Sequence, residues 1–339
     1  MQTFAPMREP QDPHLASKRI FDLIKAELAV VEEEYERQAS SNIQVIDYLG
    51  EYLRASGGKR VRPALLVLSN YAVGGDATND NVIRLATVME MLHTATLVHD
   101  DIIDNSDLRR SRASVNARFG NQTAVLMGDW LYMSAFETTV KERSLEILDI
   151  LTRLTRKMTE GELIQLTRIG RLDISESEYF DILRRKTAFL FSACCEVGAI
   201  LGGADRDEQD ALRDYGMHLG IAFQLSDDIL DLTAETATLG KSAGSDLLEG
   251  KLTLPLIYLV EKIPAIRSKL ETIMFDGEYS VISREHLKTM LIENGILQTI
   301  KDRADDYAER ARKSLEVLSE SEYRSTLEDV LTFVTERNN

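Results

Sequence analysis

The chain has very little cysteine. Its 339 residues include two, and these are the neighbours Cys194 and Cys195. A disulfide between adjacent residues is strained, so we expect two buried thiols in a reducing compartment. The first residues, MQTFAPMREPQDPHLASKR, lack the apolar core of a secretory signal and carry acidic residues that a transit peptide avoids. These absences predict a cytoplasmic protein.

Proline, glycine and long hydrophobic runs are also scarce. The chain has 6 prolines and 19 glycines, which favours helices over a turn-rich β architecture. No alternation of apolar and polar residues extends far enough to indicate a sheet. The most apolar segment, FLFSACCEVGAILGG, is interrupted by Glu196 and is too short to span a bilayer.

Positive charge is in deficit. Forty Lys and Arg residues face 56 Asp and Glu residues, giving a net charge of −16. Nucleic acids recruit basic surfaces, so this balance argues against a nucleic-acid partner. It leaves room for a locally basic pocket.

The pattern that is present is helical almost throughout. Apolar residues recur at steps of three and four, as in an amphipathic helix. The expected helical segments are residues 17–55, 83–104, 143–168, 176–203, 207–232, 252–263, 283–297 and 298–318. No linker or shift of composition divides the chain. We therefore expect one all-α domain over residues 1–339, with flexible ends at about residues 1–14 and in the last few residues.

Two short motifs repeat the same spacing of aspartates. HDDIIDNSDLRRSR contains Asp100, Asp101 and Asp104, and QLSDDILDL contains Asp227, Asp228 and Asp231. On a helix, the first and third aspartate of each motif lie one turn apart on one face, and the second flanks them. Carboxylates so close together need a compensating cation, and an oxygen-only donor set favours Mg²⁺.

A solvated acidic face is the simpler interpretation of one such motif. It does not explain why residues such as Leu97 and Ile229 surround the aspartates, or why the spacing occurs twice. An EF-hand is excluded, because the aspartates do not alternate and no glycine-centred loop follows.

Cations cluster next to the motifs. The stretch GGKRVRP brings Lys59, Arg60 and Arg62 together; Arg109, Arg110 and Arg112 follow the first motif, and Lys241 and Lys251 follow the second. Each one taken singly could be an ordinary surface residue. Together they indicate diphosphate binding, with arginine supplying forked hydrogen bonds and Mg²⁺ the remaining charge.

Other chemistries have weaker support. His99 beside Asp100 resembles the His–Asp doublet of a metal-dependent phosphohydrolase, but such a site needs several histidines. The chain has five, His14, His93, His99, His218 and His286. Nucleophilic catalysis lacks a serine elbow, and the cysteines have no histidine near them in the sequence.

The motifs together resemble a known family. GGKRVRP, EMLHTATLVHDDIIDNSDLRRSR, GELIQL, RRKTAFLF and FQLSDDILDLTAETATLGKSAGSDLLEGKLTLPL are similar, in order and spacing, to the trans-isoprenyl diphosphate synthases, or polyprenyl synthetases. The resemblance is close over residues 45–260. It implies the isoprenoid synthase fold, a large helical bundle around a central cavity. It also implies a homodimer with the 115–140 region at its interface.

The resemblance implies a reaction and a set of residues. Isopentenyl diphosphate would be joined head-to-tail to an allylic diphosphate, geranyl or farnesyl, by Mg²⁺-dependent ionisation, condensation and elimination, with the released diphosphate as base. The metal would be held by Asp100, Asp101, Asp104, Asp227, Asp228 and Asp231; the allylic diphosphate by Arg109, Lys186, Lys241 and Lys251; isopentenyl diphosphate by Lys59, Arg62, His93 and Arg110. The catalytic residues would be Lys186, Thr187 and Gln224, with Thr187 and Gln224 along the reacting carbons.

One stretch departs from the family pattern. Many members read RRGRPT where this chain has Arg109-Arg110-Ser111-Arg112-Ala113-Ser114. The lost glycine and proline change the stiffness of the loop. We expect an effect on how the loop closes and none on activity.

Product length depends, in this family, on the residues four and five positions before the first aspartate. These are Thr96 and Ala95, both small, so the cavity should continue past Leu92 and Val88, roughly 18 Å below Asp100. The helical wheel alone would select Thr96, about 40° from Asp100, over Ala95, about 140° away. The expected product is a long polyprenyl chain of C30 to C50, as used for quinone side chains, with transient membrane contact during its release. Replacing Ala95 with Phe should shorten it. A C15–C25 synthase and a non-catalytic helical subunit of a heteromeric synthase are the alternatives.

Overall fold

The computed structural model describes residues 13–110, 112–234 and 243–336. The all-α prediction is confirmed over these residues, where the only strands are β1 (Leu108–Arg109) and β2 (Arg112–Ala113), a short antiparallel hairpin that the sequence did not indicate. Residues 1–12, which belong to the expected flexible end, and Lys241 lie outside the described residues.

The first half of the chain forms α1 (Pro13–Leu23), α2 (Lys25–Ala39), α3 (Gln44–Arg54), α4 (Val61–Ala72), α5 (Asp80–Ile103), α6 (Val115–Phe119), α7 (Asn121–Lys141) and α8 (Leu145–Leu166). The second half forms α9 (Glu176–Leu183), η1 (Arg184–Ala188), α10 (Phe189–Leu201), α11 (Arg206–Thr233), α13 (Ser245–Leu248), α14 (Leu254–Lys262), η2 (Pro264–Ile266), α15 (Arg267–Asp276), α16 (Arg284–Glu293), α17 (Ile296–Ser314), η3 (Leu315–Val317) and α18 (Glu322–Thr335).

Local side-chain chemistry explains several helix boundaries. Ser175 with Glu178, and Asp205 with Glu208, form capping boxes that begin α9 and α11. The expected helix over 17–55 is instead three helices. Between α2 and α3, the Ser41 hydroxyl accepts a hydrogen bond from the Ile43 amide at 3.2 Å, which competes with helical bonding.

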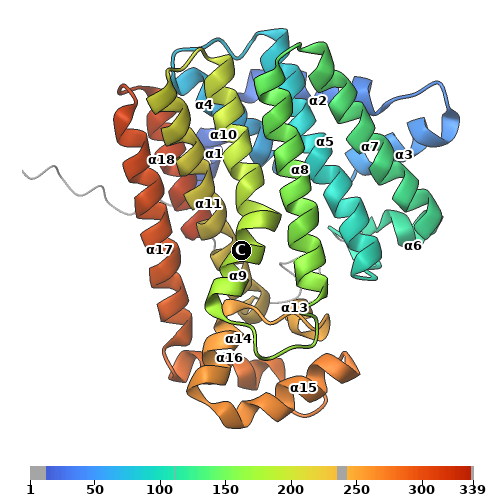
Figure 1. Cartoon of the computed structure of the whole chain (residues 1–339), viewed down its shortest axis with the longest axis vertical. Helices are drawn as coiled ribbons and strands as arrows, with labels where there is room; N and C mark the ends of the chain where they lie inside the picture. The colour runs from blue at the N-terminus through green and yellow to red at the C-terminus, as the bar shows by residue number, and fades with distance from the viewer. Residues whose placement is uncertain (1–12, 111, 235–242, 337–339) are drawn as a thin grey trace, which may run out of the picture.

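The core lies where α4, α5, α10 and α11 meet in the middle of the bundle (Figure 1). Leu65 to Leu68 of α4 are all fully buried, as expected for a helix enclosed by others. Close approach of α11 to the α9–α10 segment depends on Gly220, where a Cβ would lie 2.6 Å from the Cα of Ala188. This approach brings the second aspartate motif, further along α11, close to the segment that carries Lys186.

That segment contains a π-helical turn. The helices α9 and α10 are continuous through η1, whose five residues, RRKTA, include Lys186 and Thr187. Single π turns widen a helix locally and occur often at functional sites. Lys186 and Thr187 therefore do not follow the 3.6-residue periodicity of α9 and α10.

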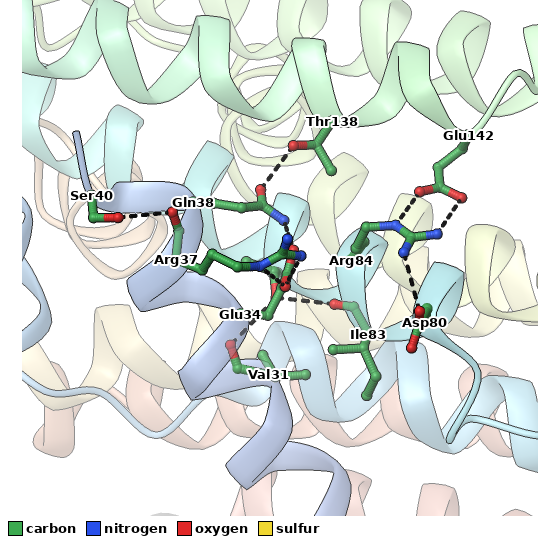
Figure 2. A network of polar contacts seen from close by, with 11 residues as sticks. Val31, Glu34, Arg37, Gln38, Ser40, Asp80, Ile83, Arg84, Thr138 and Glu142 are labelled. Carbon is green, nitrogen blue, oxygen red and sulfur yellow. Dashed lines mark hydrogen bonds and ion pairs between the residues drawn. The ribbon is translucent and has the colours of Figure 1, made fainter. Parts of the chain in front are cut away.

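A polar network joins α2, α5 and α7 away from that segment (Figure 2). Glu34 is buried and accepts hydrogen bonds from Arg37 and Gln38, and the Gln38 amide oxygen accepts one from Thr138 at 3.1 Å. Buried polar groups need such partners to avoid a loss of stability. The network therefore fixes α7 against the N-terminal helices.

The helices of the described residues include none with both the length and the apolar character of a membrane span.

Candidate active site

A cavity of about 860 Å³ opens where α5, α8, α11 and the α9–η1 segment end near one another. Both aspartate motifs line it, together with the β1–β2 hairpin and the loop around α13. The predicted residues among its lining are Lys59, Arg62, His93, Thr96, Asp100, Asp104, Arg109, Arg110, Lys186, Thr187, Gln224, Asp227, Asp228, Asp231 and Lys251.

The first aspartate motif ends α5. Asp100 and Asp104 line the cavity, but Asp101 is not among the described residues that do so. Asp101 is 4% exposed and accepts a hydrogen bond from Arg109 Nε at 2.9 Å, with a second contact from the same guanidinium. In this structure the helix turns the Asp101 carboxylate toward Arg109. The metal-ligand role of Asp101 stays a prediction.

The second motif belongs to α11, and all three of its aspartates line the cavity. Both carboxylate oxygens of Asp228 accept hydrogen bonds, one from the Tyr179 hydroxyl at 2.6 Å and one from Gln224 Nε2 at 2.9 Å. The Thr187 hydroxyl donates to the amide oxygen of Gln224 at 2.9 Å. The predicted pair Thr187 and Gln224 thus forms one chain of hydrogen bonds with Asp228.

Burial shifts the protonation of two motif aspartates. It raises the pKa of Asp100 to about 6, although the Lys186 ammonium opposes the shift. It raises the pKa of Asp228 to about 8; the neighbouring Asp246 adds to the shift, and the hydrogen bonds from Tyr179 and Gln224 oppose it. Both carboxylates are costly to ionise unless a cation joins them.

Lys251 connects the two walls. It follows the second motif in sequence, yet its ammonium contacts Asp104 of the first motif at 2.8 Å and Glu249 at 2.7 Å. Burial alone would lower the pKa of Lys251, but these two carboxylates hold it above its ordinary value. The Lys186 ammonium likewise contacts two side-chain oxygens, those of Glu162 and Gln165 in α8.

A basic region forms the other part of the cavity. Lys59, Arg62, His93 and Arg110, the predicted isopentenyl diphosphate residues, all line it. Burial lowers the pKa of His93 well below its ordinary value, and the charges of Arg62 and Arg110 lower it further, so the ring is neutral. The basic region therefore combines the charged side chains of Lys59, Arg62 and Arg110 with a neutral imidazole that can form a hydrogen bond.

The cations of the GGKRVRP stretch have different partners. Arg60 precedes α4, lines the cavity, and pairs with Glu90 at 2.7 Å and with Glu32 of α2. Arg62 lies 5.1 Å from the Phe191 ring centroid and faces the cavity. Gly58 lets the Arg110 guanidinium approach, since a Cβ there would lie 2.6 Å from Arg110 Nη1.

The predicted chain-length residues separate. Thr96 lines the cavity, whereas Ala95, Leu92 and Val88 are fully buried and are not among its described lining residues. On the helical wheel Ala95 points about 140° away from Asp100, which agrees with its place outside the described lining. The extension of the cavity past Leu92 and Val88 stays a prediction. The role of these residues in product length stays a prediction.

The sequence missed three residues of the site, Tyr179, Asp246 and Glu249. Asp246 and Glu249 lie in the quoted motif SAGSDLLEGK, so their position beside Lys251 was the available signal. Tyr179 had none, because its contact to Asp228 joins residues far apart in sequence. His99, weighed above for a phosphohydrolase, contacts the Val125 carbonyl at 3.2 Å and is outside the described cavity lining.

The donor set fits a hard divalent cation. The carboxylates facing the cavity offer oxygen ligands alone, which suit Mg²⁺ or Ca²⁺. Among the described residues, no three carboxylate, histidine or cysteine side chains are arranged to hold an ion by themselves.

Known proteins share this chain's sequence and fold. The family model named Polyprenyl synthetase matches residues 43–290. The octaprenyl diphosphate synthase of Haemophilus influenzae is 39% identical over 303 residues, 89% of this chain and 91% of that protein. A polyprenyl synthase structure from Caulobacter crescentus, complexed with calcium and isoprenyl diphosphate, has a TM-score of 0.91 and 37% identity over 98% of this chain and all of that one.

A decaprenyl diphosphate synthase structure from Rhodobacter capsulatus has a TM-score of 0.87 and 34% identity, covering 95% of this chain and 99% of that one. The family match extends over well more than half of the sequence, and the solved structures share the whole helical arrangement. On this evidence the chain belongs to the polyprenyl synthetase family.

Proposed function

We propose that this protein is a trans-prenyltransferase that adds isopentenyl diphosphate to an allylic diphosphate and makes a polyprenyl diphosphate of C30 to C50. The observation that carries the proposal is the meeting, in one cavity, of two carboxylate walls and a separate basic region. The octaprenyl and decaprenyl synthases among the similar proteins support the long product.

We propose Mg²⁺ as the metal, held by four of the carboxylates that line the cavity, Asp100, Asp104, Asp227 and Asp231. When bound, it would neutralise these groups and withdraw charge from the leaving diphosphate. The calcium in the Caulobacter crescentus structure supports an oxygen-ligated divalent cation at such a site.

The remaining chemistry falls to fixed cations and dipoles. Arg109, Lys186 and Lys251 would bind the allylic diphosphate and stabilise its negative charge as the carbon–oxygen bond breaks. The Thr187 hydroxyl and Gln224 amide, held in one hydrogen-bond chain, would face the positive charge left on the allylic carbon. The isopentenyl double bond attacks that carbon, a proton is lost, and the released diphosphate takes it.

Isopentenyl diphosphate would occupy the basic region of Lys59, Arg62, His93 and Arg110. Its diphosphate is not the leaving group, so this region needs positive charge and no metal. The neutral His93 ring is suited to donate or accept a single hydrogen bond there.

We also propose a homodimer formed through α7. Leu126, Met133 and Val140 are spaced by seven residues and so lie near one face of α7, and they are 69%, 63% and 47% exposed. A stripe of this kind on a long helix is typical of an interface. Met133→Glu should yield monomers in light scattering, and an unchanged mass would contradict the proposal.

The function is tested by incubating the pure protein with Mg²⁺, isopentenyl diphosphate and either geranyl or farnesyl diphosphate and measuring product length. C30–C50 products support the proposal, and C15–C25 products support the shorter-chain alternative. Free phosphate without a longer chain indicates a phosphohydrolase, and no turnover indicates a non-catalytic subunit.

Two variants refine the product-length assignment in the same assay. Ala95→Phe should shorten the product, as the resemblance implies, and Thr96→Phe should shorten it more, because Thr96 lines the cavity. Unchanged products from both variants would contradict any control of chain length by this part of α5. Cytoplasmic location and membrane contact during release stay predictions.

A further inference from the structure

The β1–β2 hairpin presents Arg109 and Arg110 to the cavity. Its register pairs Leu108 with Ala113 and Arg109 with Arg112. The segment from Leu108 to Ser114 contains neither glycine nor proline, and Arg110 has a φ of 52°, in the left-handed region that side chains disfavour. The sequence therefore does not hold this conformation by itself, and contacts from elsewhere must do so.

One set of contacts holds the base of the hairpin to the end of α5. The Ser114 amide donates to the Asp107 carbonyl at 2.9 Å, and the Ser114 hydroxyl donates to the Ser106 carbonyl at 2.6 Å. Asn116 Nδ2 donates to the Asp101 carbonyl at 3.1 Å. These bonds hold the base of the hairpin at the end of α5. They do not contact the strand residues Arg112 and Ala113, so the orientation of β2 depends on other contacts.

Tyr52 of α3 supplies the contact from the side. Its hydroxyl donates to the carbonyl of Ala113, in strand β2, at 2.6 Å. The guanidinium groups of Arg112 and Arg118 lie over its ring, at 4.7 and 4.8 Å from the centroid. The ring also packs edge-on against Phe119, with 5.3 Å between the two centroids. The side chain is 7% exposed, so both kinds of contact are shielded from water.

We propose that Tyr52 is a positioning residue that fixes the direction of the hairpin and so aims Arg109 and Arg110 into the cavity. The inference rests on the proposed function, because the two arginines act there as diphosphate ligands. Tyr52 itself is not among the described residues that line the cavity. It acts through the backbone of β2, whose pairing with β1 transmits the restraint to Arg109.

Tyr52→Phe tests this with the smallest change, because it keeps the ring and removes the hydroxyl. The KM for isopentenyl diphosphate should rise about fivefold, which corresponds to about 1 kcal/mol and to the loss of one neutral hydrogen bond. The kcat should change by less than about twofold, because no group in contact with the reacting carbons is altered.

Limited digestion with trypsin gives a second readout that needs no substrate. Cleavage after the hairpin arginines should become about fivefold faster in Tyr52→Phe, while cleavage elsewhere stays unchanged. Tyr48→Phe is the matched control. Tyr48 is on the same helix and accepts a hydrogen bond from Arg118 at 3.2 Å, so it loses a hydroxyl without a bond to β2.

A rise in KM together with faster cleavage at the hairpin, both absent from Tyr48→Phe, supports the proposal. If the wild-type protein is active and Tyr52→Phe changes neither quantity, the proposal is overturned. It is also overturned if cleavage increases equally along the whole chain, since Tyr52 would then contribute only to general stability. A wild-type protein that makes no prenyl product would refute the proposed function instead, and the digestion would still decide whether Tyr52 holds the hairpin.

Discussion

The two aspartate motifs have the same spacing, but different neighbours surround them. In each motif the protein holds the second aspartate by hydrogen bonds. Asp101 is held by the cation Arg109, and Asp228 by two neutral donors, Tyr179 and Gln224. Asp228 also lines the cavity, whereas Asp101 is not among the described residues that do so.

Asp101 and Asp228 are the anchor aspartates of the two motifs. The partner of Asp101 carries a charge and the partners of Asp228 are neutral, and this difference affects the pKa of each carboxyl group. Burial raises the pKa of both aspartates; the Arg109 guanidinium opposes the shift at Asp101, and the Tyr179 and Gln224 hydrogen bonds oppose it at Asp228. The pKa of Asp228 is nevertheless raised to about 8. A cation near Asp228 would therefore favour its ionised form.

The largest expected effect is a difference in kcat/KM between variants of Asp100, which lines the cavity, and of Asp101, which contacts Arg109. Asp100→Asn should lower kcat/KM by about a hundredfold or more, because it removes a group that faces the metal and the leaving diphosphate. Asp101→Asn should lower it about tenfold, since it disturbs only the position of Arg109. Steady-state kinetics at saturating Mg²⁺ measures both. Equal losses would mean that the two aspartates do not differ in role.

A smaller effect compares the anchors themselves by stability. Arg109→Gln should destabilise the protein by about 2 kcal/mol, below the roughly 3–5 kcal/mol of a fully buried pair because Arg109 is partly exposed. Tyr179→Phe should cost about 1 kcal/mol, the value of one hydrogen bond to a group that can stay protonated. Urea unfolding without metal measures both, and a larger loss in Tyr179→Phe would reverse the assigned order.

A further comparison uses the pH dependence of the stability of the metal-free protein. Asp100 and Asp228 have folded pKa values of about 6 and about 8, above the ordinary 3.8, so the folded state holds more protons than the unfolded state above about pH 4. Their contribution to stability is present at low pH and is lost as the pH rises to about 8. Stabilisation by Mg²⁺ should grow over the same range.

Urea unfolding from about pH 5 to about pH 9, with and without Mg²⁺, measures this dependence. Asp228→Asn is the control, because it should remove the part of the loss that lies above about pH 6. A stability that rises with pH in the metal-free protein would contradict these two shifts.

Much of the site follows from the sequence, because its residues belong to short motifs on helices. Spacing alone places Asp100 and Asp104 on one face, and of the cations next to the motifs Lys59, Arg60, Arg62, Arg109, Arg110 and Lys251 line the cavity. The helical wheel selected Thr96, which lines the cavity, and the extension of the cavity past Leu92 stays a prediction.

The rest depends on contacts between residues far apart in the chain. Arg60 pairs with Glu32 and Glu90, which lie far from it in the sequence, so its partners could not be read from the local motif. Tyr179 and Tyr52 reach Asp228 and Ala113 across the fold, and no local pattern marks either one. The π turn at Lys186 is likewise invisible to a 3.6-residue periodicity.

The central claim is that the two motifs form one site, which becomes electrically balanced when a divalent metal and a diphosphate bind together. Calorimetric titration of Mg²⁺ with and without inorganic diphosphate tests it most directly. Each ligand should bind weakly alone and about a hundredfold more tightly in the presence of the other. Equal Mg²⁺ affinity with and without diphosphate would contradict the account.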